Sequence, residues 1–173
     1  MSTTSVSRSN LAFRSLMAAS LAAALVIWSQ VGMAHLGGPF ARFSGSWRGS
    51  GQVVGANGHR EQIQCRAGYS LSKNGAAVAE TLACASDSYQ FDFNSDVVAV
   101  GHSVQGHWRE TTRQARGSLK GWIADGQFRG SVAGSNFTAA VSLKSNGSKQ
   151  ILYIRVSGGD IAIVDVVLAR SDV

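Results

Sequence analysis

Apolar and polar residues alternate along most of the chain after residue 42, and this two-residue period is typical of half-buried β-strands. In residues 43–53 the odd positions hold Phe43, Trp47, Val53 and three glycines, and the even positions are polar. No helical period continues for more than one turn. The pattern predicts ten strands, near residues 42–54, 60–72, 76–86, 88–94, 103–112, 116–124, 127–134, 136–144, 149–157 and 161–170, with residues 97–100 extending or bulging the fourth.

Three Asn-Gly or Asp-Gly pairs separate neighbouring predicted strands. Such a pair favours a two-residue hairpin turn, and the turn fixes which residues of the two strands face each other. In all three predicted hairpins the apolar faces coincide almost without exception. The turn at residues 74–75 places Cys65 opposite Cys84, the turn at 125–126 places Ile123 opposite Phe128, and the turn at 146–147 places Leu143 opposite Gln150 and Val141 opposite Leu152.

The two cysteines of the chain, Cys65 and Cys84, are predicted to form a disulfide. Directly opposed residues of antiparallel strands have Cα atoms about 4.5 or 5.5 Å apart, which is within disulfide reach. Two thiols supply only half of a usual zinc ligand set, so a metal site is not expected. Two buried free thiols are the alternative.

Short connections throughout the chain predict an all-β, antiparallel up-and-down meander. A small domain with so many strands must curl to bury one face and to remove its open edges. We therefore expect a single closed or nearly closed barrel of 8–10 strands, with a β-sandwich as the alternative. Gly45, Gly49 and Gly51 share the inward face of the first strand and permit the tight bending that closure requires.

The first 34 residues have the pattern of a cleaved secretory signal peptide. Residues 2–14 are polar and carry two arginines without an acid, residues 16–28 are apolar, and the small residues Gly32 and Ala34 close the segment. The apolar run is shorter than the roughly 20 residues of a membrane-spanning helix. We expect one domain at residues 35–173, a periplasmic or secreted location, and no transmembrane anchor after cleavage.

The basic balance of the chain favours anionic partners. The sequence has 16 Lys and Arg against 10 Asp and Glu, and loss of the two leader arginines leaves an excess of about four positive charges. An anionic envelope component is therefore a candidate partner. The same cations can also serve only to keep the surface soluble, and export directs the chain away from nucleic acid, so no nucleic acid is expected.

The tripeptide Gly45-Ser46-Trp47 on the first predicted strand resembles the Gly-x-Trp opening of lipocalins and of the wider calycin superfamily, which includes the avidins. The resemblance implies a ligand-holding barrel and a basic residue over the tryptophan late in the chain, for which Arg170 is the matching position. The paired cysteines and the stretch at residues 84–89 also resemble a small exported bacterial family without an assigned function. That second resemblance implies an envelope setting and no activity.

The inward face is the predicted ligand-binding site of a non-catalytic barrel. Aromatic side chains lining a barrel can hold a small apolar or amphipathic ligand, although the same rings can simply fill the interior. The candidate ligand-binding residues are Trp47, Tyr69, Glu80, Tyr89, Phe91, Trp108, Glu110 and Phe128. Phe93, Phe137 and Glu61 have the same inward parity.

The outward face carries most of the cations and supports an alternative function. On this interpretation the protein is an envelope- or protein-binding module, including a barrel-type protease inhibitor, that acts through its basic outer surface. The predicted outward cations are Arg48, Arg60, Arg66, Arg109, Lys120, Arg129, Lys144 and Arg155.

The sequence contains no motif that indicates an enzyme. None of the serines lies in Gly-x-Ser-x-Gly, and no Gly-x-x-x-x-Gly-Lys loop is present. His102 and His107 have opposite parity and would not converge on one metal. We therefore expect no catalytic residue, no metal and no cofactor.

Overall fold

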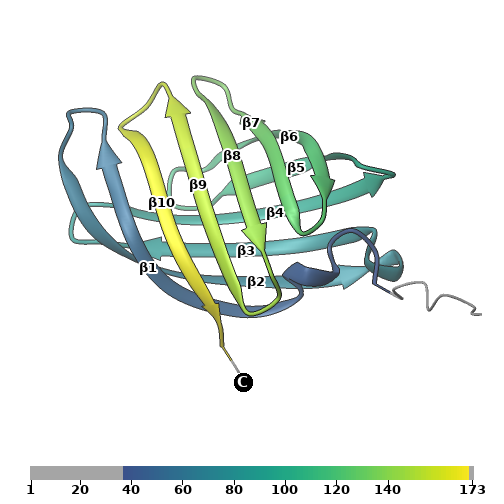
Figure 1. Ribbon diagram of the computed structural model, residues 1–173. Helices are drawn as coiled ribbons and strands as arrows, with labels where there is room; N and C mark the ends of the chain where they lie inside the picture. Colours follow the sequence, from purple (N-terminus) through teal and green to yellow (C-terminus); the bar gives the residue numbers. More distant parts are fainter. Residues whose placement is uncertain (1–36, 172–173) are drawn as a thin grey trace, which may run out of the picture. The chain divides into compact units, whose positions relative to one another are not determined.

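The computed structural model describes residues 37–171, which form an antiparallel barrel closed in the order β1-β10-β9-β8-β7-β6-β5-β4-β3-β2 (Figure 1). Ten strands make the barrel wall, and two short 3-10 helices, η1 and η2, lie before β1 and between β2 and β3. The strands are β1 (Gly45–Gly55), β2 (Arg60–Ser72), β3 (Ala77–Ala85), β4 (Gln90–Val100), β5 (Ser103–Glu110), β6 (Ala115–Ala124), β7 (Gln127–Ala133), β8 (Thr138–Ser145), β9 (Lys149–Ser157) and β10 (Ile161–Arg170); the helices are η1 (Ala41–Phe43) and η2 (Lys73–Gly75).

The predicted closed meander is confirmed. β1 pairs with β2 on one side and with β10 on the other, so the sheet has no open edge and the sandwich alternative is wrong. Most strand boundaries lie within two residues of the expectation, and the largest differences are in β1 and β4. Residues 41–43 form η1 instead of the start of a strand, and β4 runs without interruption to Val100.

Two of the three predicted turn registers are confirmed. Asn74 and Gly75 have φ of 54° and 77°, and Asp125 and Gly126 have φ of 51° and 74°, the left-handed values that a type I′ hairpin turn requires at its two central positions. Cys65 accordingly pairs with Cys84, and Ile123 with Phe128.

The third predicted register is wrong by two residues. The turn is centred on Gly147 and Ser148 instead of Asn146 and Gly147, so Leu143 faces Leu152 and Ser145 faces Gln150. Gly147 supplies the positive φ of 94°, and the Asn146 side chain accepts hydrogen bonds from the backbone N–H groups of Ser148 and Lys149 at 3.0 and 2.8 Å. This Asx turn holds Asn146 directly before the two central residues of the turn. Because the shift is two residues, each side chain keeps its predicted face.

Closure depends on the absence of side chains at two glycines of β1. A Cβ atom at Gly49 would overlap the backbone carbonyl of Val167, and one at Gly51 would overlap that of Asp165. β10 therefore approaches β1 more closely at these positions than any other residue type allows. The predicted role of these glycines in closing the barrel agrees with this contact.

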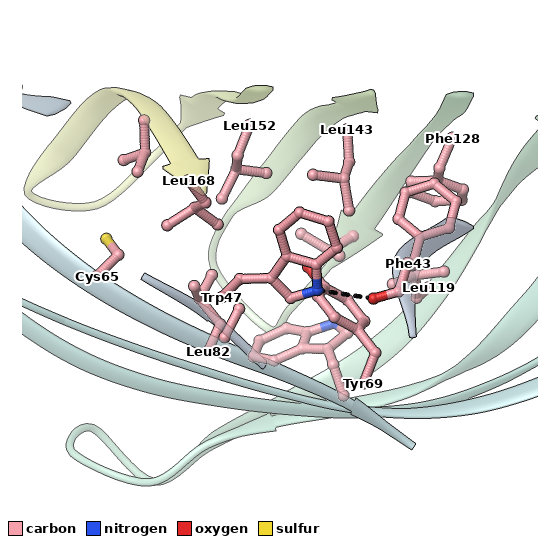
Figure 2. Close-up of a cluster of buried hydrophobic side chains, with 14 of the residues drawn as sticks. Phe43, Trp47, Cys65, Tyr69, Leu82, Leu119, Phe128, Leu143, Leu152 and Leu168 are labelled. Carbon is pink, nitrogen blue, oxygen red and sulfur yellow. Dashed lines mark hydrogen bonds between the residues drawn. The ribbon is translucent and has the colours of Figure 1, made fainter. Parts of the chain in front are cut away.

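One end of the barrel is closed by η1 and the residues before it. Phe40 and Phe43 are 5 % and 2 % exposed and pack into the core. The indole Nε1 of Trp47 donates a hydrogen bond of 2.8 Å to the carbonyl of Phe43, drawn as a dashed line in Figure 2. Arg170 crosses this end, with its guanidinium carbon 4.5 Å from the centre of the Trp47 ring. The basic residue that the calycin resemblance implied over the tryptophan is present.

The disulfide between Cys65 and Cys84 joins β2 to β3, with Cα atoms 4.2 Å apart. Both cysteines are 2 % exposed and face the core. The pairing confirms the prediction.

The predicted signal peptide, residues 1–34, lies outside the described residues. Within residues 37–171, no helix has the length and apolar character needed to cross a bilayer.

Removal of the disulfide should destabilise the barrel. Closing a loop of 19 residues restricts the unfolded chain, so the double substitution Cys65→Ala and Cys84→Ala should lower the free energy of unfolding by about 3 kcal/mol. Urea unfolding measures the change. The wild-type protein after reduction should show the same loss, and unchanged unfolding on reduction would contradict the prediction.

Arg170→Ala should also destabilise the protein, because the guanidinium stacks on Trp47 and donates hydrogen bonds of 2.7 Å to the carbonyls of Gly147 and Ser44. We expect a loss of about 1–2 kcal/mol in urea unfolding. Arg155→Ala, which removes an exposed arginine whose guanidinium group donates a hydrogen bond to Tyr153 on the same strand, is the matched control. Equal effects of the two substitutions would rule out a special role for the Trp47 contact.

Candidate functional site

The predicted interior residues all lie on the inward face of the barrel or at its rim. Trp47, Tyr69, Phe91, Trp108 and Phe128 belong to the buried core, and Glu110 is 9 % exposed. Tyr89 is partly exposed, and Glu80 is partly exposed as a residue although its carboxyl group is buried. Figure 2 shows Trp47, Tyr69 and Phe128 among the leucines of the core. The residues separate into two groups, one near the end closed by η1 and one near the opposite, open end.

A row of polar side chains begins near the closed end and crosses three neighbouring strands inside the barrel. Tyr69 on β2 faces Glu80 on β3, and Glu80 faces Ser95 on β4. The Ser95 hydroxyl, 3 % exposed as a residue, donates a hydrogen bond of 2.8 Å to Oε2 of Glu80. The next residue in the row is Trp108 on β5. The register thus places one carboxyl group among hydroxyl groups in an apolar interior.

The apolar interior changes the pKa values of Glu80 and Tyr69 in this row. Burial raises the pKa of Glu80, and the hydroxyl groups of Ser95 and Tyr69 offset part of that rise. Burial and the neighbouring Glu80 carboxylate raise the pKa of the Tyr69 phenol well above its ordinary value. A neutral Glu80 can both donate and accept hydrogen bonds, so the row can present either kind of polar contact.

Gln150 on β9 is a second polar residue of the interior. It is 0 % exposed, and its Nε2 and Oε1 atoms have no hydrogen-bond partner among the described residues. Its ladder partners are Ser145 on β8 and Leu168 on β10. Buried amides usually have hydrogen-bond partners. The Gln150 amide can therefore still donate and accept hydrogen bonds in the interior.

The open end is lined by aromatic and aliphatic side chains. Trp108 stacks on Phe93 with ring centres 5.7 Å apart and contacts Phe137 at 5.4 Å. The Trp108 indole donates a hydrogen bond of 3.1 Å to the carbonyl of Ser118. Several apolar residues that pack against the core at or towards this end are only partly buried: Tyr89, Phe93, Phe137, Ile154, Val156 and Ile161.

Two acidic residues at the open end hold loops in place. Oxygens of Glu110 accept hydrogen bonds from the backbone N–H groups of Asp92, Thr112 and Arg113 and from the Thr112 hydroxyl. Burial acts to raise the pKa of Glu110, but these bonds outweigh it and lower the pKa. Hydrogen bonds from Ser88 and Ser86 lower the pKa of Glu61 to about 2. Both carboxylates therefore already have hydrogen-bond partners within the protein.

Two hollows lie on the outer face of the barrel. The larger, about 590 Å³, lies over β1 to β4, and the smaller, about 440 Å³, lies over β4 to β6. Both contain outward arginines of the predicted set. Arg116, which lines the smaller hollow, is an outward cation that the sequence analysis did not include.

Sequence reasoning also missed Ser95 and Gln150 as interior polar residues. Ser95 fell between the predicted fourth strand and its extension, although an unbroken β4 would have placed it opposite Glu80. In the predicted register Gln150 already had inward parity, opposite Leu143. Within residues 37–171, no group of three or more His, Cys, Asp or Glu side chains is arranged to hold a metal ion.

The comparisons with known proteins support the fold. An S-type phycobiliprotein lyase from Guillardia theta has a similar structure, with a TM-score of 0.54 and 10 % sequence identity, over 78 % of this chain and 91 % of that chain. No protein-family model matches the chain, and no curated protein matches it. At this level of identity the likeness concerns the fold alone, which in this chain is a closed antiparallel barrel.

The raised pKa of Glu80 predicts a pH-dependent stability. The native state keeps a proton that the unfolded chain releases near pH 4.5, so wild-type stability should fall relative to Glu80→Gln as the pH rises above 4.5, by at most about 1.4 kcal/mol per pH unit until the native carboxyl ionises. Urea unfolding between pH 4.5 and 8 measures the difference.

Glu61→Gln is the control with the opposite sign. Its pKa is lowered, so the stability that the Glu61 carboxylate contributes is present above pH 4.5 and is lost as the pH falls towards 2. Parallel pH profiles of wild-type protein and Glu80→Gln would contradict the assignment of a buried, proton-binding Glu80.

Proposed function

We propose that this protein is a non-catalytic binding barrel that holds a small apolar or amphipathic ligand at its open end. The observation that carries the proposal is the group of partly buried apolar side chains there, around the Phe93–Trp108–Phe137 cluster. Apolar side chains left partly exposed at the mouth of a barrel can contact a small molecule. Of the predicted ligand-binding residues, Tyr89, Phe91, Trp108 and Glu110 lie in this half of the barrel.

The interior polar row gives a reason to prefer an amphipathic ligand. Ser95 and Glu80 lie in the same register row as Trp108, so a ligand that passes the aromatic cluster meets the Glu80 carboxyl group and the Ser95 hydroxyl group. Gln150 adds an amide without a partner among the described residues. A ligand with an apolar body and one polar group fits this order of side chains.

Export of the protein is part of the proposal. The disulfide between Cys65 and Cys84 is of the kind that persists in the periplasm or outside the cell, and the leader pattern of residues 1–34 agrees with that location. The proposed protein therefore binds its ligand in the cell envelope or in the surrounding medium.

A second candidate function is binding of an envelope component or a protein through the outer surface. The observation that favours it is a set of outward arginines without acidic partners. The ion pairs within residues 37–171 are His59–Glu61 and Arg113–Asp160, and neither involves the arginines of the outer hollows.

Substitution at the open end tests the first proposal. The apolar probe N-phenyl-1-naphthylamine should gain fluorescence on binding, and oleate should displace it. Val156→Lys places a charge among the apolar side chains of the open end and should weaken probe binding at least tenfold, because burying an unpaired ammonium group is costly. Fluorescence titration measures both affinities, and native mass spectrometry of freshly purified protein detects a ligand that co-purifies.

Val100→Lys is the matched control, because Val100 is 73 % exposed outside the site. It should change the affinity less than twofold. Absence of probe binding, or equal effects of the two lysine substitutions, would refute an apolar site at the open end.

A further inference from the structure

The two outer hollows are direct neighbours, because Asn94 lines both. Together they are here called the outer groove, which lies on the outward face of β1 to β6. Its outward-facing residues are Ser46, Arg48, Arg66, Gly68, Thr81, Ala83, Asp92, Asn94, Asp96, His107, Arg109 and Arg116.

Small side chains in successive strands make the floor of the groove. Ser46 faces Gly68, Gly68 faces Thr81, and Thr81 faces Asn94. In the neighbouring row Ala83 lies between Arg66 and Asp92. Directly opposed residues project to the same side of a sheet, so these short side chains leave a depression where longer ones would fill it.

A pair of arginines stands at each end of the outer groove. Arg48 directly faces Arg66, and Arg109 directly faces Arg116. All four are exposed, and none makes an ion pair with a described residue. Like charges placed directly opposite each other destabilise a sheet, so the stability of the fold gives no reason for either pair.

The middle of the groove has a different chemistry. Asp92, Asn94 and Asp96 lie between the arginine pairs. These side chains can accept hydrogen bonds from hydroxyl groups, and Asn94 can also donate them. Four strand spacings separate the two pairs, which corresponds to about 19 Å across the sheet.

We propose that the outer groove binds an acidic oligosaccharide, a carbohydrate chain whose anionic groups are separated by neutral sugar units. The arginine pairs bind the carboxylate or sulfate groups, since guanidinium groups form charge-assisted hydrogen bonds with them, and the central side chains bind hydroxyl groups. A nucleic acid fits less well, because the carboxylates of Asp92 and Asp96 would face its closely spaced phosphates. The inference rests on the second proposed function and is independent of the open-end site.

The test uses three probes of matched length with the purified protein in low salt. Hyaluronan hexasaccharide alternates acidic and neutral sugars and should bind, with an affinity that falls as salt is added. Chitin hexasaccharide, which is neutral, should bind at least tenfold more weakly, and a single-stranded oligo-dT should not bind more tightly than hyaluronan. Isothermal titration calorimetry measures all three.

Charge-matched variants localise the binding. The double substitutions Arg48→Ala/Arg66→Ala and Arg109→Ala/Arg116→Ala should each weaken hyaluronan binding at least tenfold. Arg129→Ala/Lys144→Ala removes the same charge from β7 and β8, outside the groove, and should change the affinity less than twofold. The first two variants should unfold at the wild-type temperature or above it, because each relieves a like-charge pair.

Three results would overturn the inference. They are no hyaluronan binding at millimolar concentration, equal weakening by the control variant, and tighter oligo-dT binding that the groove variants abolish, which would assign the groove to nucleic acid. The open-end probe N-phenyl-1-naphthylamine should bind all three variants normally. Loss of that probe together with hyaluronan would indicate misfolding and would count against the groove as a separate site.

Discussion

The fold depends on one strand, β1, having a partner on each of its two sides. β1 pairs with β2 along almost its whole length and with β10 from Trp47 to Gly55. The second pairing requires the carbonyl groups of β10 to occupy the space where side chains at Gly49 and Gly51 would lie. Once this contact exists, every backbone edge is used and the inward parity of each strand is fixed. The rows of side chains inside and outside the barrel follow from that parity.

The barrel wall separates two kinds of polar chemistry. On the inside, Glu80 has the hydroxyl group of Ser95 as a hydrogen-bond partner, because a buried carboxyl cannot remain without one. On the outside, the cross-strand pair Arg48–Arg66 has no acidic partner among the described residues, which water permits. The cost of burial explains the hydrogen bond between Ser95 and Glu80. The stability of the fold does not explain the Arg48–Arg66 pair, and this pair is therefore part of the argument for the proposed ligand.

The sequence allowed the strands, the closed meander, the disulfide and the sides of the strands to be predicted, because each follows from a two-residue period and from turn residues that act locally. The register of the third hairpin was not predictable in this way. Asn146 and Gly147 suit a two-residue turn by themselves, but the Asn146 side chain bonds to the following backbone N–H groups and moves the turn by one residue. A local side-chain contact thus outweighed a general preference.

The parts of the candidate sites that sequence reasoning missed depend on the curvature of the wall. Parity places Arg66 outside, but it does not indicate that small residues at Gly68 and Ala83 leave a groove beside it. Likewise, the parity of Tyr89 and Phe93 predicts that they face the interior. It does not indicate that η1 closes the opposite end of the barrel. Both features arise from how strands far apart in the sequence bend together.

The pairing of β1 with β10 also determines when the molecule can finish folding. Residues 47–55 must meet residues 161–170, so this contact has a large sequence separation and cannot form until the last described strand has been synthesised. Bringing residues so far apart in the sequence together costs loop-closure entropy, which slows the formation of this contact. Until β1 and β10 pair, each has one edge without hydrogen-bond partners, and this edge can associate with other chains. A barrel of this topology therefore exposes two strand edges to aggregation in the interval between synthesis and closure.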